Sequence, residues 1–163
     1  MATVIRGDDN FDTSKSGQVL QVVSTTKTST FSTSAGSWTD VTGLSATITP
    51  VSNQSKILVI ASVSMDAPNL VAGRLVRDST PIAVGTSGGS QFEGTFSKVS
   101  SYYAADVQSV SHLDSPNTTS STTYKIQVNG YASIALYVNR ARDMGTANRS
   151  NSVSSITLME IGE

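Results

Sequence analysis

The sequence predicts an all-β protein: an antiparallel, jelly-roll-like β-sandwich that follows a short extended N-terminal arm. Three observations predict this fold class. Apolar and polar residues alternate in many short runs, turn signals recur about every 8–12 residues, and no run keeps a helical period over three turns. Ser and Thr, which supply roughly three residues in ten, alternate with Val, Ile, Leu and Tyr, and this pattern favours strands over disorder.

The length and charge of the chain exclude several classes of function. Its 163 residues have the size of one ordinary domain, which we divide into an arm, residues 1–17, and a β-sandwich head, residues 18–163. The net charge is −1 and the Lys residues are spread singly, so we expect no nucleic-acid partner. Because no apolar run approaches the length of a membrane span and no signal peptide is visible, we expect synthesis in the cytoplasm and no membrane insertion.

The arm differs from the rest of the chain in composition. It is polar and rich in Asp, and only Val4, Ile5 and Phe11 are apolar side chains large enough to anchor it. Such a segment does not fold alone, so we expect it to become ordered by docking on another chain. Its Asp residues lack the spacing and the terminal Glu of a calcium loop, and we predict neither a metal nor a cofactor.

The head begins with a strand over residues 18–26 and is organised around a second strand over residues 56–65. In that second strand alternate residues from Ile57 to Met65 are apolar and face the core, and the opposite face changes from Leu58 and Ile60 to Ser62 and Ser64. We expect it to be buried on both faces at its start and half-solvated at its end. The alternating run of Leu44, Ala46 and Ile48 precedes it, and we expect the two to form a hairpin.

The second half of the chain continues the alternation. We expect two short strands within residues 72–84 around a turn at 78–81, a flexible loop at 85–94, and two strands within 96–113. Further strands are predicted over 123–130, through Ile134, Leu136 and Val138, and over 154–161. The expected core residues of the 96–113 region are Val99, Tyr103, Val107 and Val110.

Catalytic patterns are weak, and we predict that the protein is not an enzyme. His112 is the only histidine, and no Ser lies in a nucleophile elbow. A pair of carboxylates across a cleft would require the fold to gather Asp66, Asp106 and Asp114.

A binding surface is the stronger candidate. Tyr131, Tyr137, Arg140 and Arg142 are the residues we expect at such a surface, where they would suit a glycan or a protein. Trp38, the only tryptophan, is expected to pack at the edge of the sandwich, with sugar stacking as the alternative.

Several stretches together resemble a β-sandwich domain that is widespread in fibre and other virion proteins of marine, cyanophage-like tailed phages. The resemblance runs from about residue 17 to the end. It is carried by GQVLQVVSTTKT, WTDVTGLSATITPVSNQSKILVIASVS, RDSTPIAVG, LDSPNTTSSTTYKIQVNG, the Asn139-Arg140 and Asn148-Arg149-Ser150 stretches, and the closing SSITLMEI. The arm, MATVIRGDDNFDTS, also resembles the virion-docking N-terminus of phage fibre-type proteins.

The resemblance implies a non-enzymatic virion protein, often a homotrimer, with a jelly roll similar to tumour-necrosis-factor and complement-like heads. It would dock on other phage proteins, of the tail or the capsid, through Val4, Ile5 and Phe11. The leading expectation is a tail-fibre or receptor-binding head that contacts a host surface glycan or protein through loops such as 85–94 and 139–152. The alternatives are a capsid decoration or head-fibre protein with no receptor role, and a carbohydrate-binding module.

Overall fold

Two antiparallel sheets form a β-sandwich, which confirms the predicted fold class. The computed structural model describes residues 2–6 as backbone, and residues 16–86, 88–99, 105–145 and 151–163 with their side chains. The larger sheet contains β1 (Ala2–Arg6), β2 (Val19–Lys27), β12 (Ser154–Ile161), β5 (Lys56–Asp66), β9 (Asp106–Asp114), β11 (Leu136–Val138) and β3 (Phe31–Thr33). The smaller sheet contains β4 (Thr39–Ile48), β10 (Thr122–Gly130), β6 (Val71–Arg77), β7 (Thr80–Ile82) and β8 (Phe96–Lys98).

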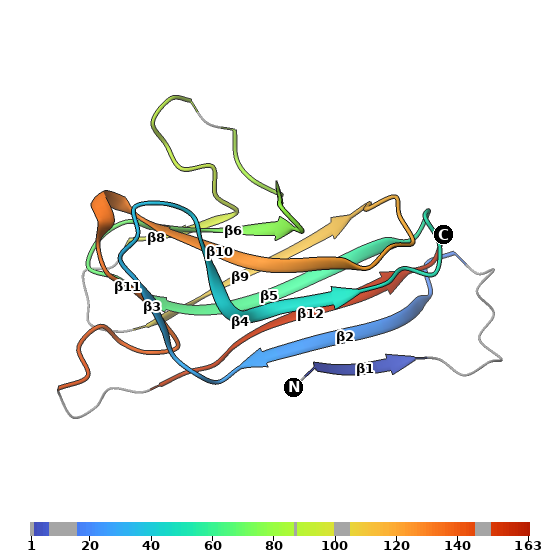
Figure 1. Cartoon of the computed structure of the whole chain (residues 1–163), viewed down its shortest axis with the longest axis horizontal. Helices are drawn as coiled ribbons and strands as arrows, with labels where there is room; N and C mark the ends of the chain where they lie inside the picture. Colours follow the sequence, from blue (N-terminus) through green and yellow to red (C-terminus); the bar gives the residue numbers. More distant parts are fainter. Residues whose placement is uncertain (1, 7–15, 87, 100–104, 146–150) are drawn as a thin grey trace.

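The strands run lengthwise, so most connections gather at two ends of the molecule (Figure 1). The described residues contain one short 3₁₀ turn, η1 (Tyr131–Ser133), and no α-helix. Within the same residues no helix is long and apolar enough to cross a membrane.

The core lies between the two sheets and follows the predicted alternation. All members of the two cleanest alternating runs are buried: Leu44, Ala46 and Ile48 in β4, and Tyr124, Ile126 and Val128 in β10. Side chains at every second position of a strand point to the same face, so each run supplies one row of the core. The predicted turn between β6 and β7 is also present, with Asp78 at a φ of 53°.

The predicted hairpin between β4 and β5 is wrong. β4 pairs with β10 in the smaller sheet, whereas β5 pairs with β12, β9 and β11 in the larger one. The connection between them crosses from sheet to sheet, and its backbone is held by side chains of the larger sheet. The Gln21 amide donates to the Thr49 carbonyl at 2.8 Å, and the Val51 N–H donates to Glu160 at 2.8 Å. These long-range bonds replace the ladder that a hairpin would have formed.

The prediction for the outer face of β5 is reversed. Ile60, near the start, is 41% exposed, whereas Ser64 and Asp66 at the end are buried. The segment that follows β11 covers this end of the strand. The Asn139 N–H donates to the Ser64 carbonyl at 2.9 Å, and the hydroxyls of Ser64 and Ser152 lie 2.6 Å apart. The buried Ser64 is therefore satisfied by polar partners from a distant segment.

Two of the predicted core residues near β9 are also wrong. Val99 is 73% exposed just after the short strand β8, and Val107 is 56% exposed on the outer face of the larger sheet. Val110 packs against the core as predicted, and Tyr103 lies outside the described residues.

The N-terminal arm begins with a strand at the edge of the larger sheet. β1 pairs antiparallel with β2, with Val4 opposite Val23 and Ile5 opposite Val22. Phe11 lies outside the described residues. The docking role of these three residues stays a prediction.

Candidate functional site

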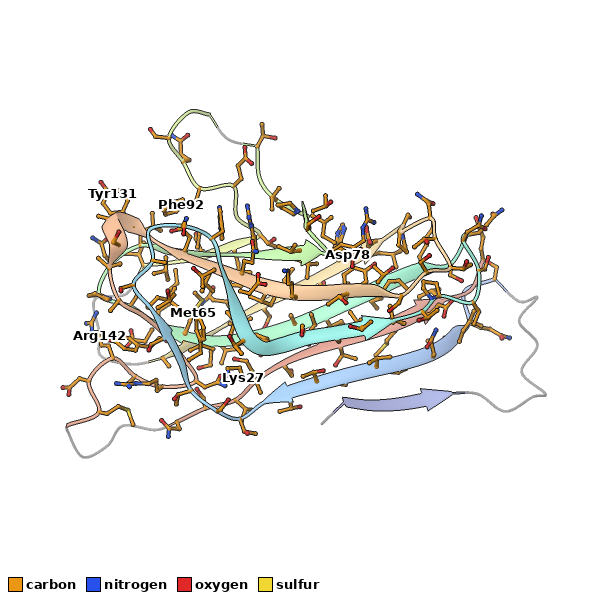
Figure 2. All side chains as sticks on the ribbon, viewed as in Figure 1. Lys27, Met65, Asp78, Phe92, Tyr131 and Arg142 are labelled. Atoms are coloured by element: carbon orange, nitrogen blue, oxygen red, sulfur yellow. The ribbon has the colours of Figure 1, made fainter. Side chains whose placement is uncertain are left out.

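The two ends of the sandwich differ in what they carry. We call the end that contains Tyr131 and Phe92 the Tyr131 end; Arg142 lies there too, and Asp78 lies toward the opposite end (Figure 2). The opposite end contains Asp114, where β9 finishes, and we call it the Asp114 end.

A pocket of about 620 Å³ opens at the Tyr131 end, between η1 and the segment that leads into β8. We call it the aromatic pocket. Its apolar lining is Leu70, Ala72, Phe92, Phe96 and Tyr131. Its polar side chains include Ser90, Gln91, Ser97 and Ser133, and none of the described residues that line it is charged. This volume lies within the range of about 300–1,000 Å³ that small-molecule sites occupy.

The floor of the aromatic pocket is built where the chain returns from the 85–94 loop onto β6. The Thr95 N–H donates to the Gly73 carbonyl at 2.8 Å, and the Thr95 hydroxyl accepts from the Leu75 N–H at 2.9 Å. These bonds bring Phe96 directly over Gly73, where any side chain larger than hydrogen would collide with the phenyl ring. The absence of a side chain at Gly73 therefore sets the position of Phe96.

Phe92 is fixed from behind by a stack of side chains. Its ring meets Trp38 edge to face, with the centroids 6.1 Å apart. The Arg74 guanidinium lies 4.2 Å from the centroid of the Trp38 ring, and its Nε donates to Gln127 at 2.8 Å. Burial lowers the pKa of Arg74, although neighbouring carboxylates oppose the shift. Trp38 therefore supports the pocket from outside its lining.

The opposite wall of the pocket has an unusual backbone. Ala132 and Ser133 both adopt positive φ, at 52° and 58°, a left-handed conformation that costs an L residue about 1–2 kcal/mol. Tyr131 is anchored by its N–H, which donates to the Leu70 carbonyl at 3.1 Å, and its side chain is 56% exposed. Two consecutive non-Gly residues in this conformation therefore shape the backbone of this wall, next to Tyr131.

The other three predicted surface residues form a separate cluster. The Arg140 guanidinium lies 4.7 Å from the centroid of the Tyr137 ring, so both residues are half-buried against each other. The Arg142 N–H donates to the Asp66 carboxylate at 2.8 Å. The structure thus brings Tyr137, Arg140 and Arg142 together, and places Tyr131 in the aromatic pocket.

The three Asp residues considered for catalysis are not gathered into one cleft. Asp66 and Asp106 both flank the buried Lys98 ammonium, at 3.8 and 3.1 Å. Lys98 also donates to the Met65 carbonyl at 2.7 Å. Asp114 lies at the other end. In the described part of the chain no group of three His, Cys, Asp or Glu residues could hold a metal ion.

Asp114 is the centre of a clamp between the sheets. It accepts from the Arg77 guanidinium at 2.8 and 3.0 Å and from the Tyr124 hydroxyl at 2.6 Å. Burial, with the hydrogen bond to Asp114, raises the pKa of Tyr124 well above its ordinary value, so the phenol stays protonated as a donor. The clamp joins β9 to β6 and β10. Its carboxylate, guanidinium and phenol groups are hydrogen-bond partners of one another.

Sequence reasoning missed the aromatic pocket. Of its aromatic residues, Phe92 lies in the stretch predicted as the flexible surface loop 85–94, and Phe96 lies at the start of the strand region predicted over 96–113. The pair of aromatic residues at this junction was the available signal. Neither a scan against protein-family models nor a search of curated proteins finds a match for this chain.

Proposed function

We propose that this chain is a virion structural protein of a tailed phage, of the tail-fibre or receptor-binding type, that docks through its N-terminal arm and presents a trimeric β-sandwich head. The aromatic pocket is the observation that carries the attachment role. It is concave, it lies at one end of a β scaffold, and it combines one exposed and two half-buried aromatic residues with uncharged polar groups. The resemblance to phage fibre proteins supplies the biological setting.

The outer face of the larger sheet supports the trimer. A cross-strand row of apolar side chains, Leu113, Leu58, Met159 and Val22, runs over β9, β5, β12 and β2. The next two rows on this face consist of Ile60 with Ser and Thr residues, and Lys56 is the charged residue at its margin. A sheet face with so little charge suits burial against identical copies.

Cell adsorption tests the attachment role. The purified full chain, labelled with a fluorophore, should bind the host bacterium and should reduce phage adsorption in a concentration-dependent way. A protein that is incorporated into virions but neither binds cells nor competes with phage would be a capsid decoration, and that result would overturn the receptor-binding proposal.

Deletion of residues 1–15 tests the docking role. We expect loss of incorporation into virions with a folded head, because β2 keeps its pairing with β12 when β1 is absent. Light scattering on the same variant measures the oligomer. Persistent incorporation would contradict docking through the arm, and a monomer would contradict the trimer.

A further inference from the structure

We infer that the aromatic pocket is a binding site for an uncharged saccharide, which would be the surface ligand of the proposed attachment protein; the inference rests on that proposed function. A saccharide ring has one apolar C–H face and a periphery of hydroxyls. The aromatic pocket offers both kinds of surface: three aromatic rings, Phe92, Phe96 and Tyr131, and polar side chains such as Gln91 and Ser133.

The composition of the pocket lining disfavours both charged and purely apolar ligands. Because no described residue that lines the pocket is charged, an anionic or cationic ligand would lose its hydration without gaining a counter-charge. A purely apolar ligand would instead leave the amide of Gln91 and the hydroxyls of Ser90, Ser97 and Ser133 without partners. A neutral molecule with hydroxyls around an apolar face can contact the aromatic rings and also form hydrogen bonds with the polar side chains of the lining.

The pocket is also held ready before any ligand arrives. Phe92 is fixed against Trp38, Phe96 lies over Gly73, and the backbone of Tyr131 is anchored by its N–H, which donates to the Leu70 carbonyl. Aromatic rings that are already positioned lose little conformational freedom on binding. The backbone strain at Ala132 and Ser133 is the kind of feature that is kept where it shapes a site.

The binding test uses saturation-transfer NMR on the full chain with a panel of defined probes. The neutral probes are the methyl pyranosides of glucose, galactose and mannose, with N-acetylglucosamine, and the charged probe is N-acetylneuraminic acid. We expect transfer to at least one neutral probe and none to the charged probe. Binding should also change the emission of Trp38, because Trp38 contacts Phe92.

Two variants and a matched control locate the site. Phe92→Ala and Tyr131→Ala should each weaken binding of the responding probe by about tenfold or more, since each removes one stacking ring. Val99→Ala removes an apolar side chain that is close in sequence to the pocket but outside its lining, at a residue that is 73% exposed, and should leave the affinity unchanged. Circular dichroism of each variant confirms that the sandwich is retained.

Three results of the NMR experiment would overturn the inference: no transfer to any neutral probe, preference for the charged probe, or equal binding by the wild type and both pocket variants. Binding of an apolar dye that no neutral sugar displaces would assign the pocket to an apolar ligand instead. Failure of the proposed function is distinguishable, because sugar binding without competition against phage adsorption would retain the site and reject the attachment role. Adsorption that survives both pocket variants would retain the attachment role and would show that the surface ligand does not bind in the pocket.

Discussion

The two ends of this sandwich are built from the same strands, yet polar and aromatic side chains have different partners at each end. At the Asp114 end, a carboxylate, a guanidinium and a phenol satisfy one another across the core. At the Tyr131 end, aromatic rings are held at a pocket by hydrogen bonds made behind them, and the backbone of Ala132 and Ser133 is left-handed. Polar groups that satisfy one another and an open aromatic pocket are therefore separated along one set of strands.

The largest effect is expected at Asn139, which closes the base of the 139–152 segment at the Tyr131 end. Its buried amide donates to the carbonyls of Lys27 and Ser29 and accepts from the Ser154 hydroxyl at 2.6 Å. Asn139→Ala removes these three bonds at a φ of 62°, and should lower the free energy of unfolding by about 3–5 kcal/mol.

Chemical denaturation measures that loss, and Asn139→Gly separates its two causes. Glycine also loses the hydrogen bonds but tolerates the left-handed backbone, so it should be more stable than the alanine variant by about 1 kcal/mol. A loss below about 1 kcal/mol for Asn139→Ala would contradict the role of this amide.

Asp114→Ala should produce the next largest effect, at the opposite end. It leaves the buried Tyr124 hydroxyl without its acceptor and Arg77 without its carboxylate, at a cost of about 2–4 kcal/mol. The control is Asp40→Ala, which removes a carboxylate that is 50% exposed and pairs with Lys125, and should cost less than about 1 kcal/mol. Equal losses in the two variants would mean that the clamp is not what stabilises the Asp114 end.

Gly73→Ala tests the floor of the pocket. The added methyl group would collide with Phe96, so we expect a loss of about 1–3 kcal/mol together with loss of ligand binding. Gly85→Ala is the matched control, because its methyl group would approach nothing closer than the Gly94 carbonyl at 3.9 Å. Unchanged stability and binding in Gly73→Ala would show that Phe96 does not depend on this glycine.

The smallest effect is expected at Asp40, on the exposed face of β4. Partial burial raises its pKa, but hydrogen bonds from Lys125 and Gln127 and the charges of Lys125 and Arg74 outweigh burial and hold the pKa below its ordinary value of 3.8. The carboxylate therefore stabilises the fold above pH 3.8, and this contribution is lost as the pH falls through the lowered pKa.

Thermal unfolding between about pH 6 and pH 2.5 checks this sign, because the range brackets the ordinary carboxyl pKa. The melting temperature of the wild type should fall more steeply than that of Asp40→Asn, which lacks the titrating group. Parallel curves for the two proteins would contradict the assignment.

Local alternation predicted the parts of the fold that depend on one strand at a time. The inward faces of β4 and β10 could be identified from Ala46 or Ile126, because neighbours two positions apart share a face. Which strands pair could not be identified in this way. β4 and β5 are adjacent in sequence but lie in different sheets, held apart by bonds to Gln21 and Glu160, more than a hundred residues apart.

The candidate site was predicted only in part for the same reason. Tyr131 was identified as an exposed aromatic residue, and the loop that contains Phe92 was identified as a surface loop. Their approach depends on β6 and β10 being neighbours, and on Gly73 accommodating Phe96. The segment that begins at Asn139 covers Ser64, and the alternation of apolar and polar residues along a strand could not predict this contact either.

The separation of the two ends can be tested directly by two-dimensional NMR of the isotope-labelled chain, titrated with the neutral sugar that gives saturation transfer. We expect shifted amide signals to cluster at residues 90–97 and 130–133, with residues around Asp114 unchanged. Shifts concentrated at the Asp114 end, or spread evenly over both ends, would contradict this expectation.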